Sequence, residues 1–184
     1  MKKLFSFVAA ALMSVAMFAG PNDLLWDYSA GAPSENPDNG LSYASKITDG
    51  PGVKNGLYGI KLNSSGYAAF TKAAVAGTLK LGFGPRSGTS ATSVAVYTWA
   101  GDTPAAETLI ATTAELTEYG YVQVDLPAEY TNIYLKRGGS VETALQVIQF
   151  TEYVPRDFTD FKIEFRTDPM TVILPETGTL PTGV

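Results

Sequence analysis

The chain has 184 residues, with 18 acidic and 13 basic side chains and a net charge of −5 at pH 7. It contains neither histidine nor cysteine, which excludes disulfides, thiolate or imidazole metal sites, and Ser-His-Asp or Cys-His catalysis within this chain. The negative charge and the scattered basic residues also argue against nucleic-acid binding, which requires a basic surface.

The first 19 residues have the organisation of a secretory signal peptide. Lys2 and Lys3 precede an apolar run from Leu4 to about Ala19, which is too short for a membrane-spanning helix. Loss of the two lysines leaves eleven basic against eighteen acidic residues, a net charge of −7. We expect an exported protein, located extracellularly, at the cell surface or in the periplasm, with no membrane span in its mature part. A retained membrane anchor or a buried N-terminal helix is the alternative.

Residues 20–154 have the pattern of an all-β protein, an antiparallel two-sheet β-sandwich of the jelly-roll type. The apolar cluster from Leu24 to Tyr28 predicts a first strand at the sandwich edge, with Trp26 in the core. The turn-rich remainder up to Gly56 is expected to be a long loop. Further strands are predicted, in chain order, at Leu57 to Leu62, Tyr67 to Lys72, Thr78 to Phe83, Ser93 to Trp99, Glu107 to Thr113 and Ala144 to Phe150.

The clearest alternation lies between Gly120 and Arg137. Val122, Val124 and Leu126 alternate with polar residues, and the pattern resumes after Pro127 with Ile133 and Leu135. Two alternating arms around a short loop predict a hairpin in which Val124 lies opposite Ile133.

This hairpin predicts a solvated face with the composition of a sugar-binding site. Aromatic rings stack on the apolar face of a pyranose, while amide and carboxylate groups bind its hydroxyls. An ordinary wet sheet face is the alternative, and core packing is the alternative for Trp99, which ends its strand near the sandwich rim. The predicted ligand-binding residues are Tyr121, Gln123, Asp125, Asn132, Tyr134, Lys136 and Trp99.

The loops contain oxygen donors of the kind that hold a structural calcium ion in secreted sandwiches, namely Asp38, Asn39, Asp49 and Asn55. They lack the Asp-x-Asp-x-Asp-Gly spacing, and their preference for turns is the alternative explanation.

Beyond Pro155, the alternation of Phe161, Ile163 and Phe165 predicts an additional strand, followed by an extended, proline-punctuated linker over residues 155–184. It either ends the sandwich or opens a second unit. Residues 174–178, LPETG, match the sortase pentapeptide, but no apolar span and basic tail follow, so coincidence within a linker is the preferred interpretation. We expect that the natural protein continues beyond Val184.

Catalysis has little support in the sequence. Glycoside hydrolysis requires two carboxyl groups facing each other across a substrate cleft, and local sequence marks no such pair among the 18 acidic residues. We therefore expect no enzymatic activity. A small lyase or hydrolase with converging carboxylates or Tyr, Lys and Arg side chains is the alternative.

Together with the signal peptide, the segments GIKLNSSGYAAFTK, TLKLGFG, SVAVYTW, YVQVDL and NIYLKRGG resemble accessory β-sandwich modules of secreted bacterial polysaccharide-degrading proteins. The chain is similar in particular to noncatalytic jelly-roll modules found beside pectate lyase and related domains, from Leu24 to Glu152. The resemblance implies a carbohydrate-binding or spacer module, often with a structural calcium ion.

The combined expectation is a noncatalytic secreted module that binds or presents plant or host glycan. Its partner would be a polysaccharide or oligosaccharide, and it would form the N-terminal part of a larger polysaccharide-processing protein with a downstream catalytic domain. With two tryptophans, the chain fits soluble or branched glycans better than crystalline cellulose. The alternative is a structural or protein-interaction module, such as a spacer or an adhesin segment, without sugar affinity.

Overall fold

The computed structural model describes residues 20–48, 55–153, 164–165 and 172–173. The predicted signal peptide, Asp49 and the LPETG segment lie outside these ranges. The chain divides into two compact units, residues 1–153 and 154–184. All regular elements in the described ranges are β-strands. Within them, no helix has the length and apolar character needed to cross a membrane.

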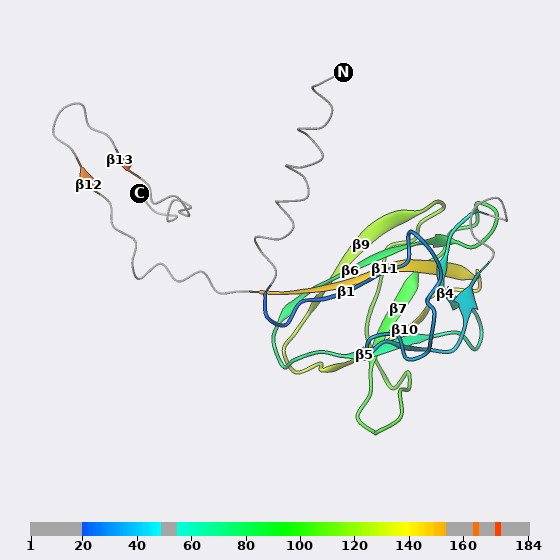
Figure 1. The fold of residues 1–184 in the computed structure, drawn as a ribbon, viewed down its shortest axis with the longest axis horizontal. Helices are drawn as coiled ribbons and strands as arrows, with labels where there is room; N and C mark the ends of the chain where they lie inside the picture. The colour runs from blue at the N-terminus through cyan, green and yellow to red at the C-terminus, as the bar shows by residue number, and fades with distance from the viewer. Residues whose placement is uncertain (1–19, 49–54, 154–163, 166–171, 174–184) are drawn as a thin grey trace, which may run out of the picture. The chain divides into compact units, whose positions relative to one another are not determined.

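The first unit is an antiparallel β-sandwich, as predicted (Figure 1). We name its layers the β9 sheet and the β10 sheet. The β9 sheet has the order β3-β4-β11-β6-β9, with β1 also paired to β11, and comprises β1 (Leu24–Asp27), β3 (Lys46–Ile47), β4 (Gly59–Leu62), β6 (Gly77–Pro85), β9 (Gly120–Leu126) and β11 (Thr143–Glu152). The β10 sheet has the order β2-β5-β10-β7-β8 and comprises β2 (Ser42–Tyr43), β5 (Ala68–Thr71), β7 (Val94–Thr98), β8 (Thr108–Thr112) and β10 (Asn132–Arg137).

The strand order is that of a jelly roll. Strands β4 to β11 give the orders β4-β11-β6-β9 and β5-β10-β7-β8, so most consecutive strands alternate between the two sheets. Every strand predicted between Leu57 and Phe150 is present, with small shifts at its ends. The fold class predicted from period-two alternation is therefore confirmed.

One core fills the space between the sheets. On β6, Leu79, Leu81 and Phe83 point inward, and on β10, Ile133 and Leu135 do the same; all five are fully buried. Each buried side chain of this size contributes roughly 1.5–3 kcal/mol relative to exposure. Because the intervening residues of each strand point outward, the same alternation that builds the core also determines what each outer face presents.

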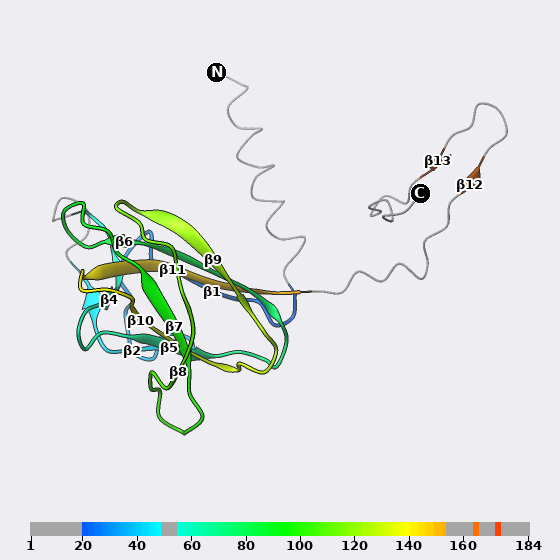
Figure 2. The ribbon, with the colours of Figure 1, turned by 180° about the vertical axis from the view of Figure 1, so that it is seen from behind.

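The predicted hairpin is wrong. Strand β9 pairs with β6, where Val124 lies opposite Leu79, and β10 pairs with β5 and β7. The link over residues 127–131 therefore crosses from one sheet to the other, as the two opposite views show (Figures 1 and 2). Two amphipathic strands can bury their apolar faces as neighbours in one sheet, or as members of two sheets that face each other across a core. The sequence pattern is the same in both cases.

The N-terminal segment is partly as predicted. Strand β1 pairs along the edge of β11, and Trp26 is buried, with its ring 5.1 Å from that of Phe70. The predicted long loop, however, contains β2 and β3, each two residues long. Of the strand predicted over Phe161 to Phe165, the structure describes Glu164–Phe165 as β12, which pairs with β13 (Val172–Ile173) in the second unit.

Candidate functional site

The outer face of the β9 sheet presents polar and aromatic side chains in cross-strand rows. Strand β6 lies between β11 and β9, so each row takes one residue from each of these three strands. Successive rows are about 7 Å apart, since they are two residues apart along a strand. The rows are Val147, Gly82 and Tyr121; then Gln149, Lys80 and Gln123; then Thr151, Thr78 and Asp125.

A groove of about 350 Å³ lies over the second and third of these rows. Its walls combine amide, hydroxyl, ammonium and phenol groups, and none of its lining side chains is a carboxylate. Amides and hydroxyls both donate and accept hydrogen bonds, so such a lining suits a ligand rich in hydroxyl groups. The lining residues are Thr78, Lys80, Gln123, Gln149, Thr151 and Tyr153.

Tyr153 presents a fixed aromatic surface at one end of the groove. Its hydroxyl donates a hydrogen bond of 2.6 Å to Oδ1 of Asp125 and lies 3.0 Å from the Thr78 hydroxyl. Its backbone N–H donates to the carbonyl oxygen of Ala76 at 2.9 Å. The side chain is nevertheless 53% exposed. Both ends of the residue are thus held while the ring remains open to solvent.

Tyr121 occupies the row at the other end of this face and is 54% exposed. The Lys80 ammonium lies 4.4 Å from its ring centroid, and the Tyr119 ring meets it edge-on, with centroids 5.5 Å apart. A Cβ atom at Gly82 would lie 2.6 Å from the Tyr119 hydroxyl and 2.8 Å from the Tyr121 ring. The two rings can settle against the sheet because Gly82 has no side chain. Burial raises the pKa of the Tyr119 hydroxyl well above its ordinary value.

The predicted binding strip is divided between two faces. Tyr121, Gln123 and Asp125 project from the β9 sheet, whereas Asn132, Tyr134 and Lys136 project from the outer face of the β10 sheet. The core separates them, so a single six-residue strip is wrong. A binding role for each half by itself stays a prediction.

Tyr134 and Trp99 lie together in a separate aromatic cluster outside the β10 sheet. They are 9% and 8% exposed, respectively. The Tyr134 ring stacks on that of Tyr67, with centroids 4.9 Å apart and an interplanar angle of 18°. Asn132 donates from Nδ2 to the carbonyl oxygen of Trp99 at 3.0 Å. With these side chains packed on one another, little ring surface remains for a ligand.

Five groove residues were absent from the predicted site: Thr78, Lys80, Gln149, Thr151 and Tyr153. A usable signal was present, because the polar positions of TLKLGFG and of QVIQFTEY alternate with the buried ones. What the sequence did not supply was the pairing of β6 with both β9 and β11, which brings these positions onto one face.

The predicted calcium ligands have roles in local structure. Oδ2 of Asp38 accepts a hydrogen bond of 2.8 Å from the Tyr28 hydroxyl, and Asn39 adopts a φ of 49° in the adjoining turn. Nδ2 of Asn55 donates to the carbonyl oxygens of Pro85 and Gly88. The described residues contain no group of three or more His, Cys, Asp or Glu side chains placed to hold a metal. A structural calcium ion remains an untested expectation.

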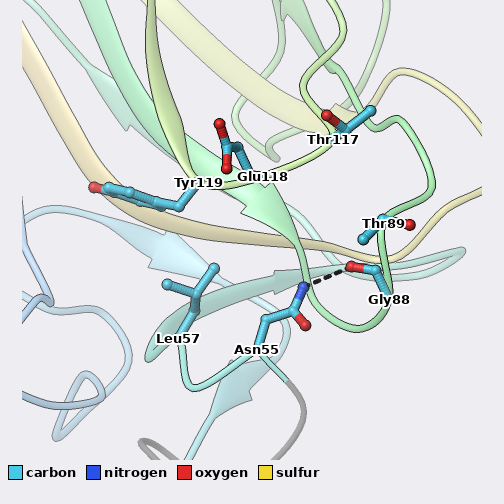
Figure 3. Close-up of a pocket in the computed structure, with 7 residues that line it drawn as sticks. All are labelled: Asn55, Leu57, Gly88, Thr89, Thr117, Glu118 and Tyr119. Carbon is cyan, nitrogen blue, oxygen red and sulfur yellow. Dashed lines mark hydrogen bonds between the residues drawn. The ribbon is translucent and has the colours of Figure 1, made fainter.

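A second pocket of about 320 Å³ lies among the turns next to Tyr119 (Figure 3). Figure 3 shows Asn55 reaching across to the carbonyl oxygen of Gly88, a contact of 2.9 Å. Glu118 and Thr117 approach from the opposite side. The walls of this pocket are turn segments. Its lining does not combine an exposed, anchored aromatic ring with a row of amides and an ammonium, as the lining of the groove does.

Comparisons with known proteins assign no family. No protein-family model and no curated protein sequence matches the chain. Among solved structures, the chain is similar to a protein from the Ruminococcus flavefaciens cellulosome, whose complexity is described as reflecting an expansion in glycan recognition. The two chains have 20% sequence identity and a TM-score of 0.44, over 74% of this chain and 100% of that chain. The CBM22-1-GH10 modules of Clostridium thermocellum endo-1,4-beta-D-xylanase 10B, complexed with xylohexaose, have 14% identity and a TM-score of 0.45.

The xylanase match covers 73% of this chain, which spans 30% of the xylanase chain. The catalytic unit of a GH87 alpha-1,3-glucanase from Streptomyces thermodiastaticus has 14% identity and a TM-score of 0.39, over 74% of this chain and 27% of that chain. At these values the similarities assign neither a family nor a ligand.

Proposed function

We propose that the chain is a noncatalytic module that binds polysaccharide or oligosaccharide in the groove on the outer face of the β9 sheet. The observation that carries the proposal is Tyr153, a half-exposed ring anchored by Asp125 and Thr78 at the edge of a groove lined with amides and hydroxyls.

The groove has the two kinds of contact that a pyranose needs. A sugar has an apolar face, which stacks on an aromatic ring, and a rim of hydroxyls, which require donors and acceptors in fixed directions. Tyr153 offers the ring, and Gln149 and Gln123 offer amide groups from the neighbouring row. Because the Tyr153 hydroxyl is already bound, stacking would cost little ordering of its side chain.

The lining also fits binding better than hydrolysis. Glycoside hydrolysis requires two carboxyl groups across the substrate, and the six lining residues include none. Asp125 borders the groove, but its Oδ1 accepts the Tyr153 hydrogen bond. We extend the proposal to an exported protein in which this module accompanies a catalytic domain, which is motivated by the signal-peptide pattern of residues 1–19 and the linker-like composition of residues 155–184.

Affinity electrophoresis of the purified protein through gels containing pectin, xylan, mannan or β-glucan tests the proposal. We expect one polymer to retard migration, and Tyr153→Ala to weaken this retardation at least about tenfold, since stacking on an aromatic ring is lost. Leu109→Ala is the matched control, because Leu109 is 54% exposed on β8 in the other sheet. Unretarded migration in every gel would favour a spacer or adhesin module instead.

A further inference from the structure

We propose that the groove selects a glycan bearing a carboxylate, a uronic acid residue, and that Lys80 is the group that binds this carboxylate. The inference rests on the proposed function and names the class of sugar that the same groove prefers.

Lys80 lies on the middle one of the three strands beneath the groove. It belongs to the row Gln149, Lys80, Gln123, with β6 in the middle of the three strands. Its ammonium lies 4.4 Å from the centroid of the Tyr121 ring, which holds the charged end above the sheet. A ligand in the groove can therefore meet this ammonium at the end nearer Tyr121.

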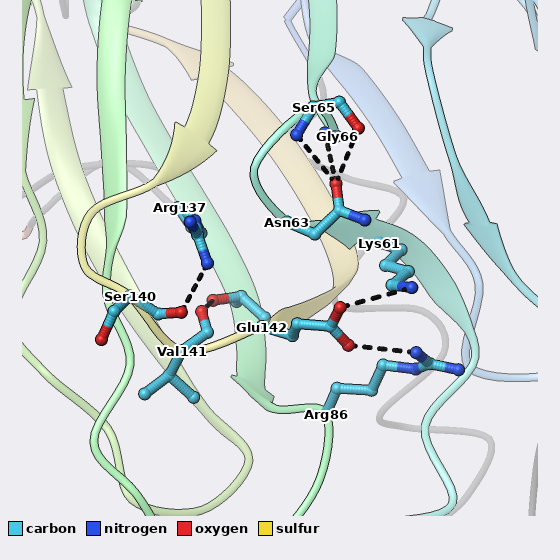
Figure 4. A network of polar contacts seen from close by, with 10 residues as sticks. Lys61, Asn63, Ser65, Gly66, Arg86, Arg137, Ser140, Val141 and Glu142 are labelled. Carbon is cyan, nitrogen blue, oxygen red and sulfur yellow. Dashed lines mark hydrogen bonds and ion pairs between the residues drawn. The ribbon is translucent and has the colours of Figure 1, made fainter.

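The Lys80 ammonium has no carboxylate within ion-pair distance among the described residues, and no oxygen acceptor there. Lys136, on the outer face of the β10 sheet, likewise has no ion pair or hydrogen bond with a described residue, whereas three other lysines of this unit are paired, Lys46 among them through the carbonyl oxygen of Pro33. The Lys61 ammonium lies 3.4 Å from Oε1 of Glu142 (Figure 4), and that of Lys72 donates to the carbonyl oxygens of Ala73 and Val75. Lys80 thus retains N–H donors for a ligand at a position where the fold supplies no partner for them.

The neighbours of Lys80 favour a carboxylate as that partner. A carboxylate has two oxygens, and an ammonium with an adjacent amide N–H can donate to both. Gln123 and Gln149 flank Lys80 on either side in the same row. The carboxylate of a ligand carries one negative charge, which the single Lys80 ammonium can neutralise. Its two oxygens can accept hydrogen bonds from the ammonium and from the amide groups of Gln123 and Gln149. A charge-assisted hydrogen bond is also roughly twice as strong as a neutral one.

Asp125 limits where further carboxylates can lie. It occupies the next row, about 7 Å away along the strand, next to Tyr153. Its negative charge repels a second carboxylate there, so the sugar that stacks on Tyr153 should be neutral. The groove therefore fits a glycan with a uronic acid beside neutral sugars better than an uninterrupted polyuronate.

Calorimetric titration with a matched pair of ligands tests the inference. The ligands are a xylotriose carrying one glucuronic acid and the same compound with its carboxyl reduced to a hydroxymethyl group. We expect the acidic form to bind at least about tenfold more tightly, since a charge-assisted hydrogen bond contributes more than a neutral one. In Lys80→Met the two forms should bind equally. Lys136→Met is the control, since Lys136 projects from the other sheet and should leave the difference intact.

The outcomes separate the inference from the proposed function. Equal binding of the two ligands by the unaltered protein, or a preference that survives Lys80→Met, would overturn the role of Lys80 while leaving glycan binding in place. Binding of neutral polymers but of no acidic glycan would also overturn the role of Lys80 and leave glycan binding in place. Absence of binding to this pair and to all four polymers in the gels would overturn both proposals.

Discussion

The hydroxyl of Tyr153 donates a hydrogen bond of 2.6 Å to Oδ1 of Asp125 and so ties the residue after β11 to the end of β9, across the intervening strand β6. The bond fixes an exposed ring with a carboxylate that the protein does not use in an ion pair within its described part. Asp125 thus acts here as the support of the aromatic surface that Tyr153 presents.

Asp125→Ala should weaken glycan binding about two- to tenfold, because a freed Tyr153 side chain must be ordered when a sugar stacks on it. Tyr153→Phe, which keeps the ring but loses the hydroxyl, should have a similar effect. Affinity electrophoresis with the retarding polymer measures both, and urea unfolding checks that stability is preserved. If both variants bind as tightly as the unaltered protein, the anchoring bond has no role in recognition.

Tyr134→Ala should lower the free energy of unfolding by about 3 kcal/mol, because it removes a 9% exposed ring that stacks on Tyr67. Tyr121→Ala is the contrasting change, since Tyr121 is 54% exposed and its contacts with Tyr119 and Lys80 should contribute only about 1 kcal/mol. Urea denaturation followed by fluorescence measures both values. A Tyr134→Ala protein of unchanged stability would show that the cluster on the β10 sheet is not tightly packed.

The contribution of Glu142 to stability should disappear in acid. Burial alone would raise the pKa of its carboxyl, but hydrogen bonds and charges from Arg86 and Lys61 together hold the pKa below its ordinary value. The stabilisation is then complete above the unfolded pKa of about 4.3 and is lost as the pH falls through the lower folded value. Because the carboxylate is 41% exposed, we expect at most about 1 kcal/mol.

This pH dependence is measured as the difference in unfolding free energy between the unaltered protein and Glu142→Gln from pH 7 to pH 3. The difference should shrink below about pH 4. Glu115→Gln is the control, because Glu115 is exposed and makes no ion pair with a described residue. A difference that stays constant over the whole range would mean that the network in Figure 4 does not depend on the Glu142 charge.

Alternation along the chain was sufficient to predict the strands, because each strand of a sandwich buries one face. It gave the inward positions of β6 and β10 and the outward positions of Tyr121, Gln123 and Asp125. The two-residue strands β2 and β3 escaped prediction because two residues are too few to display a period.

Strand partners could not be predicted in the same way. Val124 meets Leu79 rather than Ile133, since the link over residues 127–131 changes sheets. The backbone N–H of Lys72, on the neighbouring strand segment, donates to the carbonyl oxygen of Thr131 at 2.8 Å and holds that link. Such a long-range contact leaves no local pattern. Tyr153 was overlooked for a related reason, because its register depends on the extension of β11 to Glu152.

The crossing between β9 and β10 makes the module two-sided. Residues 120–126 and 132–137 are close neighbours in sequence, yet their outward side chains belong to opposite exteriors, with the core between them. Substitutions in one segment can therefore remodel one exterior while the other keeps its chemistry. A short stretch of coding sequence thus encodes two surfaces that can diverge independently, and a ligand bound on one side would leave the other side free.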